Sequence, residues 1–352
     1  MSSTEYSDYI DDADPVEEVS SVKQIQVELP IELRGERIDK AIAKVLTEYS
    51  RSKIQQWLEA GLIYENERQL QVKDTASGQQ ILQISVPNDP QNEAFLPENI
   101  PLKVVFSDEN IAIIDKPYGM VVHPAAGNWS GTLLNALLYL FPECSQVPRA
   151  GIVHRLDKDT SGLLVIAKNS IAQLGLVKQL QDRSMQRKYL ALAWGKTPTT
   201  KVIHGSIGRD PRDRLKMGIT LGHGKEATTH LQTLCHAKFE GKDLSLLSCQ
   251  LETGRTHQIR VHLESIGHAL VNDPVYKNRI PHQTAQVLKE QLLSHQIDFP
   301  GQFLHAGLLG FMHPITHEQL IFSQPASLPM LQMLDFLQIE PVVWQKAFET
   351  CN

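Results

Sequence analysis

GIVHRLDKDTSGLLVIAK, residues 151–168, is the stretch that decides the fold. Its second half, Leu163 to Ala167, is a run of apolar residues that is typical of a strand buried on both faces. Its first half places one carboxylate, Asp157, between Arg155 and Asp159. Burying an ionised carboxylate is unfavourable unless it is paired and hydrogen-bonded. Asp157 is therefore either a structural ion-pair partner or a reactive group with a tuned pKa.

Other chemistries fit this stretch less well. The string Asp159-Thr160-Ser161-Gly162 differs from the Asp-Thr-Gly of aspartic proteases by one inserted residue, and no second copy supplies a partner carboxylate. A hydrolase that uses two carboxylates therefore lacks its second acid. The sequence also contains neither a Gly-x-x-x-x-Gly-Lys-Ser/Thr phosphate-binding loop nor a Gly-x-Ser-x-Gly nucleophile elbow.

The composition is that of a soluble protein with room for one large domain and one small domain. The chain has 352 residues, of which 41% are hydrophobic. It contains no run of about 18 apolar residues, and its start lacks the basic and apolar segments of a signal peptide. We therefore expect a cytoplasmic protein that is not inserted in a membrane.

Neither the cysteines nor the histidines suggest a metal site. The cysteines lie far apart and form no Cys-x-x-Cys pair, so a zinc knuckle or a disulfide framework is not indicated. Their positions are Cys144, Cys235, Cys249 and Cys351. His257 and His262 are separated by a spacing that places them on different sides of a strand and only loosely together on a helix. We expect no bound metal.

The net charge of −6 is concentrated at the N-terminus. Residues 1–20 hold seven of the 40 acidic residues and no Lys or Arg, which leaves 33 acidic against 34 basic residues in the body of the chain. A nearly neutral body can still carry a basic face, so the composition does not exclude a nucleic-acid partner. The acidic segment 1–21 has little to bury, and we expect it to be disordered.

The segment 22–88 has the pattern of a small domain with two short helices and several strands. Val22 to Leu29 alternates as a strand does, and Ser50 offers an N-cap to a helix from Arg51 to Ala60. Apolar residues at helical spacing form one stripe on each helix, namely Ile38, Ile42, Val45 and Leu46, and then Ile54, Trp57 and Leu58. Two further strand patterns follow, at Ile63–Val72 and Gln80–Val86.

Basic side chains lie on this helix pair, in particular Arg37 before the first helix and Arg51 and Lys53 at the start of the second. They either solvate the outer faces of an amphipathic helix pair or contact RNA phosphates, and the residues alone leave both readings open. The turn after the second helix carries Glu65 and Glu67, two acidic residues that weaken contact with phosphate.

A proline-rich segment, 89–101, predicts a linker to a larger domain at 102–340, which a tail at 341–352 follows. The strands predicted in the larger domain are Leu102–Phe106, Ile111–Asp115, Leu163–Ala167, Gln186–Ala193, Val202–Gly208, Ala227–Ala237, Leu244–Leu251 and a last one from Leu304. The predicted helices are Thr132–Phe141 and Ser170–Arg183, the second with Ser170 as its cap.

Two further features of the larger domain are Tyr189 and a basic segment. Tyr189 lies in an alternating strand, where a tyrosine is by default a core ring with its hydroxyl at the rim. The basic segment from Arg209 to Lys225 is either a phosphate-binding loop or a solvated surface loop.

HRLDKDTSG, residues 154–162, followed by an apolar strand, resembles the active-site motif of the RluA family of pseudouridine synthases. Two other stretches resemble motifs of that family: Lys116 to Pro124, and Gly254 to His262, which is similar to its pattern Gly-Arg-x-His-Gln-Ile-Arg-x-His. The helix pair at 22–88 resembles an S4 RNA-binding domain, with Tyr64 to Glu67 in place of the usual Val-Asn-Gly-like turn. The resemblance implies an α+β fold. A small N-terminal S4 domain is followed by a domain with a mixed, mainly antiparallel sheet and flanking helices.

The resemblance also implies roles for single residues. Asp157 matches the catalytic nucleophile, Arg260 the arginine that pairs with it, and Tyr189 a ring in the catalytic pocket. Arg155 is expected to fill the hole left by a flipped-out base, and His154 to help order the loop. Further RNA contacts are expected from Arg255, Ile259, Arg37, Arg51 and Lys53, whereas Lys116 and Pro117 are expected to support the active-site loop rather than react.

The implied reaction breaks the N1 to C1′ glycosidic bond of a uridine in RNA, turns the uracil and rejoins it through C5. Nothing is oxidised and no group is donated, so no cofactor is expected. The expected partner is RNA, most of all large-subunit ribosomal RNA, and the chain is expected to act as a monomer without membrane or metal. Two alternatives stay open: the same reaction on transfer RNA or another RNA, and a catalytically idle RNA-binding or ribosome assembly factor.

Overall fold

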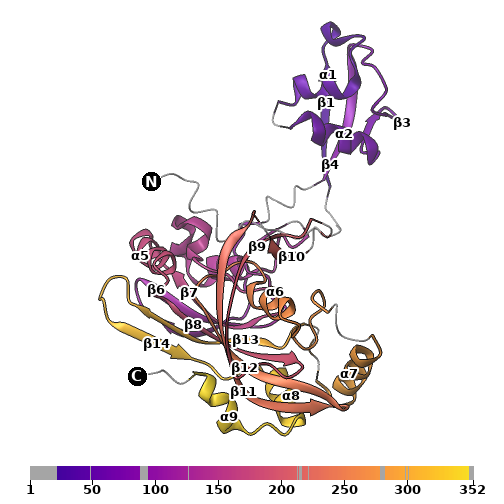
Figure 1. Ribbon diagram of the computed structural model, residues 1–352. Helices are drawn as coiled ribbons and strands as arrows, with labels where there is room; N and C mark the ends of the chain where they lie inside the picture. The colour runs from indigo at the N-terminus through magenta and orange to yellow at the C-terminus, as the bar shows by residue number, and fades with distance from the viewer. Residues whose placement is uncertain are drawn as a thin grey trace. The chain divides into compact units, whose positions relative to one another are not determined.

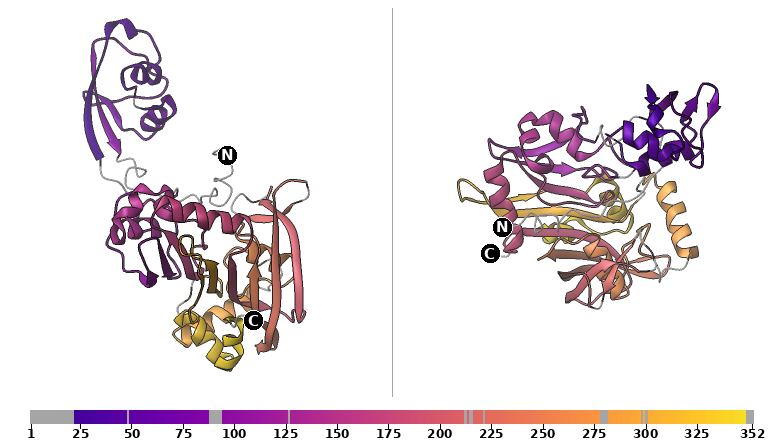
Figure 2. Two further views of the ribbon diagram at one scale, coloured as in Figure 1. Left: turned by 90° about the vertical axis from the view of Figure 1, so that its left-hand side faces the viewer. Right: turned by 90° about the horizontal axis from the view of Figure 1, so that it is seen from above.

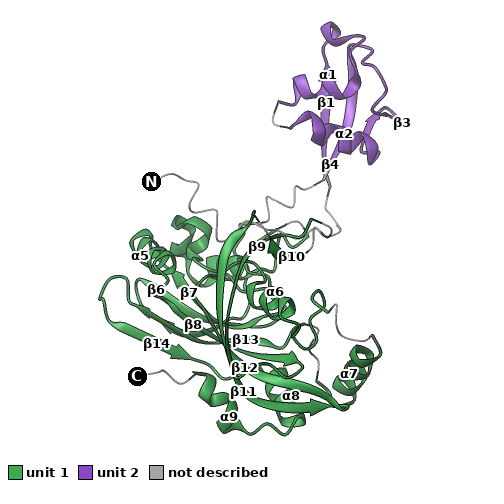
Figure 3. Ribbon diagram, viewed as in Figure 1, with its two compact units in different colours: residues 1–16, 94–352 green, residues 17–93 purple. Residues whose placement is uncertain are grey.

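The computed structural model describes residues 22–47, 49–87, 94–125, 127–211, 213, 216–220, 222–277, 282–297, 299 and 301–348. The predicted acidic tail, 1–21, lies outside this part of the chain. The described residues fall into two compact units, one before residue 88 and one from Ala94 onward (Figure 3). No helix in the described ranges is long and apolar enough to cross a membrane.

The N-terminal unit consists of two helices packed on a small antiparallel sheet (Figure 1). Its elements are β1 (Val22–Leu29), α1 (Ile38–Val45), α2 (Arg51–Glu59), β2 (Ile63–Glu65), β3 (Arg68–Gln69) and β4 (Gln80–Pro87). The strand order is β1-β4-β2-β3. The predicted apolar stripes meet in one core, in which Ile38, Ile42, Ile54 and Trp57 are buried. Buried stripes on both helices fix their orientation on the sheet.

The local signals in this unit act as their chemistry predicts. The Ser50 side chain accepts a hydrogen bond from the backbone N–H of Lys53 and so caps α2, as expected. In the β2–β3 turn, Glu65 pairs with Arg68, and Asn66 adopts a positive φ of 55°. Asparagine tolerates this left-handed conformation better than most residues, which explains how a turn without glycine closes here.

The larger unit is built on one sheet of ten strands in the order β10-β9-β11-β12-β8-β13-β7-β6-β5, with β14 paired to β13. All neighbouring strands are antiparallel except β13 and β7, so the predicted mixed, mainly antiparallel α+β fold is confirmed. The strands are β5 (Lys103–Ser107), β6 (Ile111–Lys116), β7 (Ser161–Ala167), β8 (Gln186–Trp194), β9 (Thr200–Arg209), β10 (Met217–Thr220), β11 (Lys225–Phe239), β12 (Lys242–Leu251), β13 (Leu304–Met312) and β14 (Gln319–Ser323).

Helices cover both faces of this sheet (Figure 2). They are α4 (Leu133–Leu140), α5 (Ser170–Gln181), α6 (Gln258–Ser265), α7 (His282–Ser294), α8 (Leu328–Phe336) and α9 (Pro341–Gln345). Alternate residues of β8 show the two sides: Tyr189 and Ala191 share a core with α4 and α6, whereas Leu190 and Leu192 share one with α7 and α8. The face under α4 and α6 carries the candidate active site.

The structure corrects one expectation and adds detail to two others. The cap of α5 is Asn169, whose side chain accepts from the backbone N–H of Ala172, rather than Ser170. Part of the predicted linker is fixed to the larger unit, because the Asn135 side chain donates to the carbonyls of Ala94 and Leu96.

The described part of the predicted tail at 341–352 contains a short helix. Pro341–Gln345 forms α9, and Ala347 is buried against the sheet. The basic segment from Arg209 to Lys225 also contains a short strand, β10, paired with β9, while Arg212 and Arg214 lie outside the described residues. The described cysteines, Cys144, Cys235 and Cys249, are free thiols.

Candidate active site

The Lys116 side chain holds the loop that carries Asp157 at the start of β7. The Lys116 ammonium donates to three carbonyls, those of Pro117, Met120 and Lys158, at 2.8, 2.9 and 3.0 Å. These bonds tie the end of β6 to the residue after Asp157, in keeping with the expected supporting role of Lys116. Burial lowers the pKa of Lys116 to about 7, against the charges of Asp159 and Asp157.

Glycine at position 162 lets β7 approach β13 closely. Gly162 has φ +114°, and a Cβ there would lie 2.2 Å from the carbonyl oxygen of Ala306. A residue with a side chain would separate the parallel pair β7–β13 next to the catalytic loop.

Asp157 and Arg260 form the predicted ion pair. Arg260 is the third residue of α6, and its Nη1 donates to Asp157 Oδ2 at 3.0 Å. The side chain of Arg260 is 5% exposed and that of Asp157 is 16% exposed, so the pair is nearly dry while the carboxylate still reaches the surface of the pocket. Among the described residues, nothing donates a hydrogen bond to Asp157 Oδ1, which leaves this oxygen available to a substrate.

The charges around Asp157 keep it ionised. Burial by itself would raise the pKa of Asp157, but His257, Arg260 and Arg155 lower it to about 2. Because burial lowers the pKa of His257, the two guanidinium groups carry this effect at neutral pH. The pKa of Arg260 is raised, because its hydrogen bonds to Asp273 and the charge of Asp157 outweigh the effect of burial. Both partners are therefore charged at neutral pH.

A second carboxylate, Asp273, holds the other side of the Arg260 guanidinium. Arg260 Nε donates to Asp273 Oδ2 at 2.8 Å, and Nη2 donates to Oδ1 at 3.0 Å. The ring of Tyr276 lies 5.0 Å from the guanidinium carbon. Arg260 is thus fixed by a two-point ion pair and an aromatic ring, and it offers one nitrogen to Asp157.

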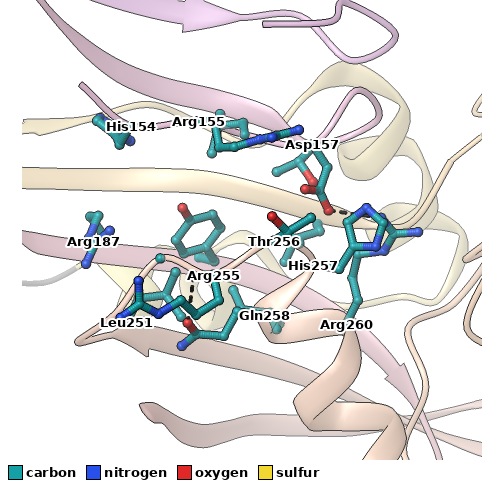
Figure 4. A pocket seen from close by; sticks show the side chains of 16 residues that line it. His154, Arg155, Asp157, Arg187, Leu251, Arg255, Thr256, His257, Gln258 and Arg260 are labelled. Carbon is teal, nitrogen blue, oxygen red and sulfur yellow. Dashed lines mark hydrogen bonds and ion pairs between the residues drawn. The ribbon is translucent and has the colours of Figure 1, made fainter. Parts of the chain in front are cut away.

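One pocket brings together most of the residues that the sequence singled out (Figure 4). Figure 4 shows His154, Arg155 and Asp157 along one wall, with Arg255 and Gln258 across from them. Of the predicted site residues, the pocket is lined by His154, Arg155, Asp157, Tyr189, Arg255, Ile259 and Arg260.

His154 lines the pocket and is also hydrogen-bonded to the strand that follows its loop. Its Nε2 accepts a hydrogen bond from the backbone N–H of Val165 at 3.2 Å, which ties the loop to β7. Burial, helped by the charge of Arg187, lowers the pKa of His154 to about 3, so the imidazole is neutral. This geometry fits the role expected for His154.

Tyr189 is buried in the core shared with α4 and α6, and it also lines the pocket. Burial raises the pKa of its hydroxyl to about 12, so the phenol stays neutral. Tyr189 therefore lies at the boundary of core and pocket, and it is both a core ring and a pocket residue.

Arg255 and Ile259 form the wall next to Arg260. The Nε of Arg255 donates to the carbonyl of Glu226 at 3.1 Å, and its backbone N–H donates to the Gln258 side chain at 3.0 Å. Ile259 is 3% exposed and packs in the core beneath the pocket. Ile259 therefore shapes the apolar part of this wall.

The three basic residues singled out in the N-terminal unit do not share one environment. Arg37 and Arg51 both donate to Asp39, whose carboxylate is fully buried, and Gln55 donates to the same carboxylate. The two arginine side chains remain 52% and 47% exposed. The pairing with Asp39 was not foreseen, and the exposed parts of both arginine side chains leave solvation and contact with phosphate both open. The backbone N–H of Lys53 donates to the Ser50 side chain.

Within the ranges that the structure describes, no group of three or more His, Cys, Asp or Glu side chains is arranged to hold a metal ion. The reactive groups of the pocket are thus one open carboxylate oxygen, a fixed guanidinium, a neutral phenol and further arginines. This set can bind an anionic polymer and present an ionised carboxylate to an electrophilic carbon.

Comparison with known proteins identifies the family. The pattern that describes RNA pseudouridylate synthases matches residues 110–265, which include Asp157, Tyr189 and Arg260. A protein of Neisseria meningitidis serogroup B named ribosomal large subunit pseudouridine synthase D is 44% identical over 334 residues, which cover 95% of this chain and 87% of that protein. The chain belongs to the RNA pseudouridylate synthase family. The synthase is therefore an isomerase that acts on RNA, and the family resemblance of its motifs is confirmed.

Further relatives agree with this assignment. The protein of the same name from Pseudomonas aeruginosa is 42% identical to the synthase over 322 residues, which cover 91% of this chain and 98% of the relative. The solved structure titled human RNA pseudouridylate synthase domain containing 4 superimposes with a TM-score of 0.52 at 22% identity and covers 67% of this chain and 93% of that chain. This likeness supports the fold of the larger unit.

The sequence alone did not single out three further residues of the synthase's site: His257, Asp273 and Arg187. His257 was considered only as a metal ligand, yet its imidazole lies close enough to affect the pKa of Asp157. Asp273 precedes Pro274 and looks like an ordinary turn, although it pairs with Arg260. Arg187 lies two residues before Tyr189, and the period of two in a strand was the signal that could have placed it on the pocket side.

Proposed function

We propose that the synthase converts uridine to pseudouridine in large-subunit ribosomal RNA, with Asp157 as the nucleophile. The observation that carries the residue assignment is the state of Asp157: it is ionised, nearly buried, and bonded through one oxygen only. The printed names of the most similar relatives support the choice of ribosomal RNA.

The chemistry needs an anion beside C1′ and C6 of the target nucleotide. Asp157 Oδ1 supplies it, while Arg260 keeps the mostly buried carboxylate charged. The N1 to C1′ bond breaks, the uracil turns and the C5 to C1′ bond forms. The hydrogen on C5 leaves as a proton, and N1 takes up a proton. The reaction is an isomerisation and requires no oxidant, reductant or group donor.

Positioning of the target base falls to the other residues of the pocket. A uridine in folded RNA reaches Asp157 only when it is flipped out of the stack, and this leaves a hole. Arg155 lines the pocket, stays partly exposed, and is placed two residues before the nucleophile, so we assign it to that hole. Tyr189 provides an aromatic edge for the base, and Arg255 a charge for the neighbouring phosphates.

The N-terminal unit is proposed to be the S4-like domain that selects the RNA. Its two helices present Arg37 and Arg51 with about half of each side chain exposed, while their shared pairing with Asp39 fixes the spacing of the two guanidinium groups. Fixed cations of this kind add phosphate contacts and orientation but no chemistry at the base. Residues 22–88 are proposed as this domain and 102–340 as the catalytic domain, with Ala94 to Pro101 docked onto the latter.

The proposed substrate is tested with transcripts that carry tritium at uracil C5. Forming the C5 to C1′ bond expels that hydrogen, so tritium release into water counts pseudouridine formed. We expect release from large-subunit ribosomal RNA at a higher kcat/KM than from transfer RNA. Faster release from transfer RNA would replace the proposed substrate, and binding without release from any RNA would favour the idle RNA-binding factor.

A further inference from the structure

The carboxylate of Asp273 is more fully bonded than any other group near the nucleophile. Its side chain has no exposed surface. Oδ1 accepts the backbone N–H groups of Val275 and Tyr276 at 2.8 and 2.9 Å, in addition to Arg260 Nη2 at 3.0 Å. Oδ2 accepts Arg260 Nε at 2.8 Å. Four donors on one carboxylate fix its position, and with it the position of the guanidinium.

Asp273 and Asp157 accept different numbers of hydrogen bonds from the Arg260 guanidinium. Asp273 takes the Nε and Nη2 edge, which is the edge suited to a two-point pair, and Asp157 receives Nη1 alone. If Arg260 were not held by Asp273, its planar fork would favour a two-point pair with the other carboxylate. Such a pair would engage both oxygens of Asp157.

We propose that Asp273 is a positioning residue for the reaction: it holds Arg260 by a two-point ion pair, so that Arg260 contacts one oxygen of Asp157 and leaves Oδ1 open for the nucleotide. This inference rests on the proposed role of Asp157. It extends that role by naming the group that prevents Arg260 from engaging both oxygens of the Asp157 carboxylate.

The first test is Asp273→Asn. Asparagine keeps an acceptor oxygen for the Val275 and Tyr276 amides, but its NH₂ group faces the Arg260 donors instead of accepting from them. We expect the single-turnover rate of tritium release at saturating RNA to fall about 100-fold, the scale of a displacement of about 1 Å in a catalytic group. The RNA Kd should stay within about twofold of the wild-type value, because no RNA contact is removed.

Asp108 offers a matched control. Its Oδ1 likewise accepts two backbone N–H groups, those of Asn110 and Ile111, and its Oδ2 pairs with His313 at 3.0 Å. It lies at the β5–β6 turn, beside the end of β7 opposite to Asp157. Asp108→Asn should change thermal stability while leaving the single-turnover rate unchanged. An equal loss of rate in both variants would overturn the proposal, because the loss would then be a general effect of stability.

A double-mutant cycle separates action through Arg260 from an independent effect. If Asp273 acts by holding Arg260, Asp273→Asn should change the residual rate of Arg260→Ala less than twofold. Multiplied losses in the double variant would overturn the proposal.

A third variant covers the case in which Asp273→Asn does not fold. Asp273→Ser keeps a hydroxyl acceptor, and removing the carboxylate leaves space for a small anion beside the cleft that Asp273 and α7 residues line. Sodium formate should raise the rate of this variant at least about 10-fold relative to sodium chloride at equal ionic strength. Absence of rescue would overturn the proposal. An inactive Asp157→Asn together with a fully active Asp273→Asn would reject this inference and keep the proposed function.

Discussion

Each unit of the molecule contains a buried carboxylate paired with arginine, and the two carboxylates are used differently. Asp39 in the N-terminal unit receives Arg37, Arg51 and Gln55, and its side chain is fully buried. Among the residues that the structure describes, the Asp157 carboxylate in the larger unit accepts only from Arg260, and it remains 16% exposed in a pocket. Both carboxylates are ionised at neutral pH, since the pKa of each is lowered despite burial.

The difference shows what separates a structural carboxylate from a reactive one. Charge state alone does not, because both groups keep their negative charge. The distinguishing feature is unused acceptor capacity: Asp39 has donors on both oxygens, whereas Asp157 Oδ1 has none among the residues that the structure describes. In the active site the saturated carboxylate is Asp273, and its pairing with Arg260 allows Asp157 to stay open.

Apart from loss of the Asp157 carboxylate itself, the largest effect is expected from Arg260→Ala, which removes the cation that Asp157 and Asp273 share. Breaking a buried ion pair costs about 3–5 kcal/mol, and part of this is lost from the ionisation and placement of Asp157. Turnover should therefore fall by about 100-fold or more. Arg183→Ala is the control, because Arg183 makes an exposed pair with Glu252 at 3.4 Å and should leave turnover unchanged. Normal turnover of Arg260→Ala at neutral pH would show that the pairing does not matter.

A smaller effect of a different kind is expected from Asp39→Asn. The change should destabilise the N-terminal unit by about 1.5–3 kcal/mol, the usual loss for a hydrogen bond to a charged group. Faster hydrogen exchange of the β1 and β4 amides in the full-length chain would report it. The single-turnover rate at saturating RNA should not change, because Asp39 supports only the N-terminal unit. Glu36→Gln, which removes an exposed pair with Lys44, is the control and should leave exchange as it is. A reduced rate with normal exchange would contradict the distinction between the two carboxylates.

An effect on stability alone concerns Lys116, a buried side chain that donates to three uncharged carbonyls. Its pKa is about 7 in the folded chain, whereas an unfolded lysine titrates near 10.4. Between these values the unfolded chain binds one more proton, so this group makes the free energy of unfolding rise with pH by about 1.4 kcal/mol per unit. Below about pH 7 both states are protonated and the slope vanishes.

Lys116→Met should lack this slope, and urea titrations of both proteins at pH 7, 8 and 9 measure it. Groups other than Lys116 contribute equally to the two proteins and cancel in the difference. Equal slopes for the wild type and Lys116→Met would mean that Lys116 keeps its proton across this range.

Much of the fold and of the site was predictable from sequence because the signals are local or belong to long motifs. The apolar run of β7, the stripes of α1 and α2, and the cap at Ser50 each follow from a few neighbouring residues. The pairing of Asp157 with Arg260, two residues far apart in the chain, was predicted only through the family resemblance.

The missed features depend on contacts that no local pattern reports. Asp273 followed by Pro274 has the composition of a turn, and its partner becomes visible only when α6 packs beside that turn. Asn169 rather than Ser170 caps α5 because two neighbouring polar residues can both serve, and backbone geometry chooses between them. Residues 341–348 pack on the sheet through apolar contacts, and Ala347 is buried there. The sequence of this short segment does not predict these contacts.

The central claim is that the open oxygen of Asp157 performs the reaction, and Asp157→Asn tests it most directly. Asparagine is nearly isosteric and keeps a carbonyl that can accept the Arg260 hydrogen bond, so the variant should fold and bind RNA. It lacks the ionised oxygen that acts on the ribosyl or base carbon. With large-subunit ribosomal RNA tritiated at uracil C5, the wild type should release tritium and Asp157→Asn should release none, at comparable RNA affinity. Release by the variant at the wild-type rate would contradict the account and leave Asp157 a structural partner of Arg260.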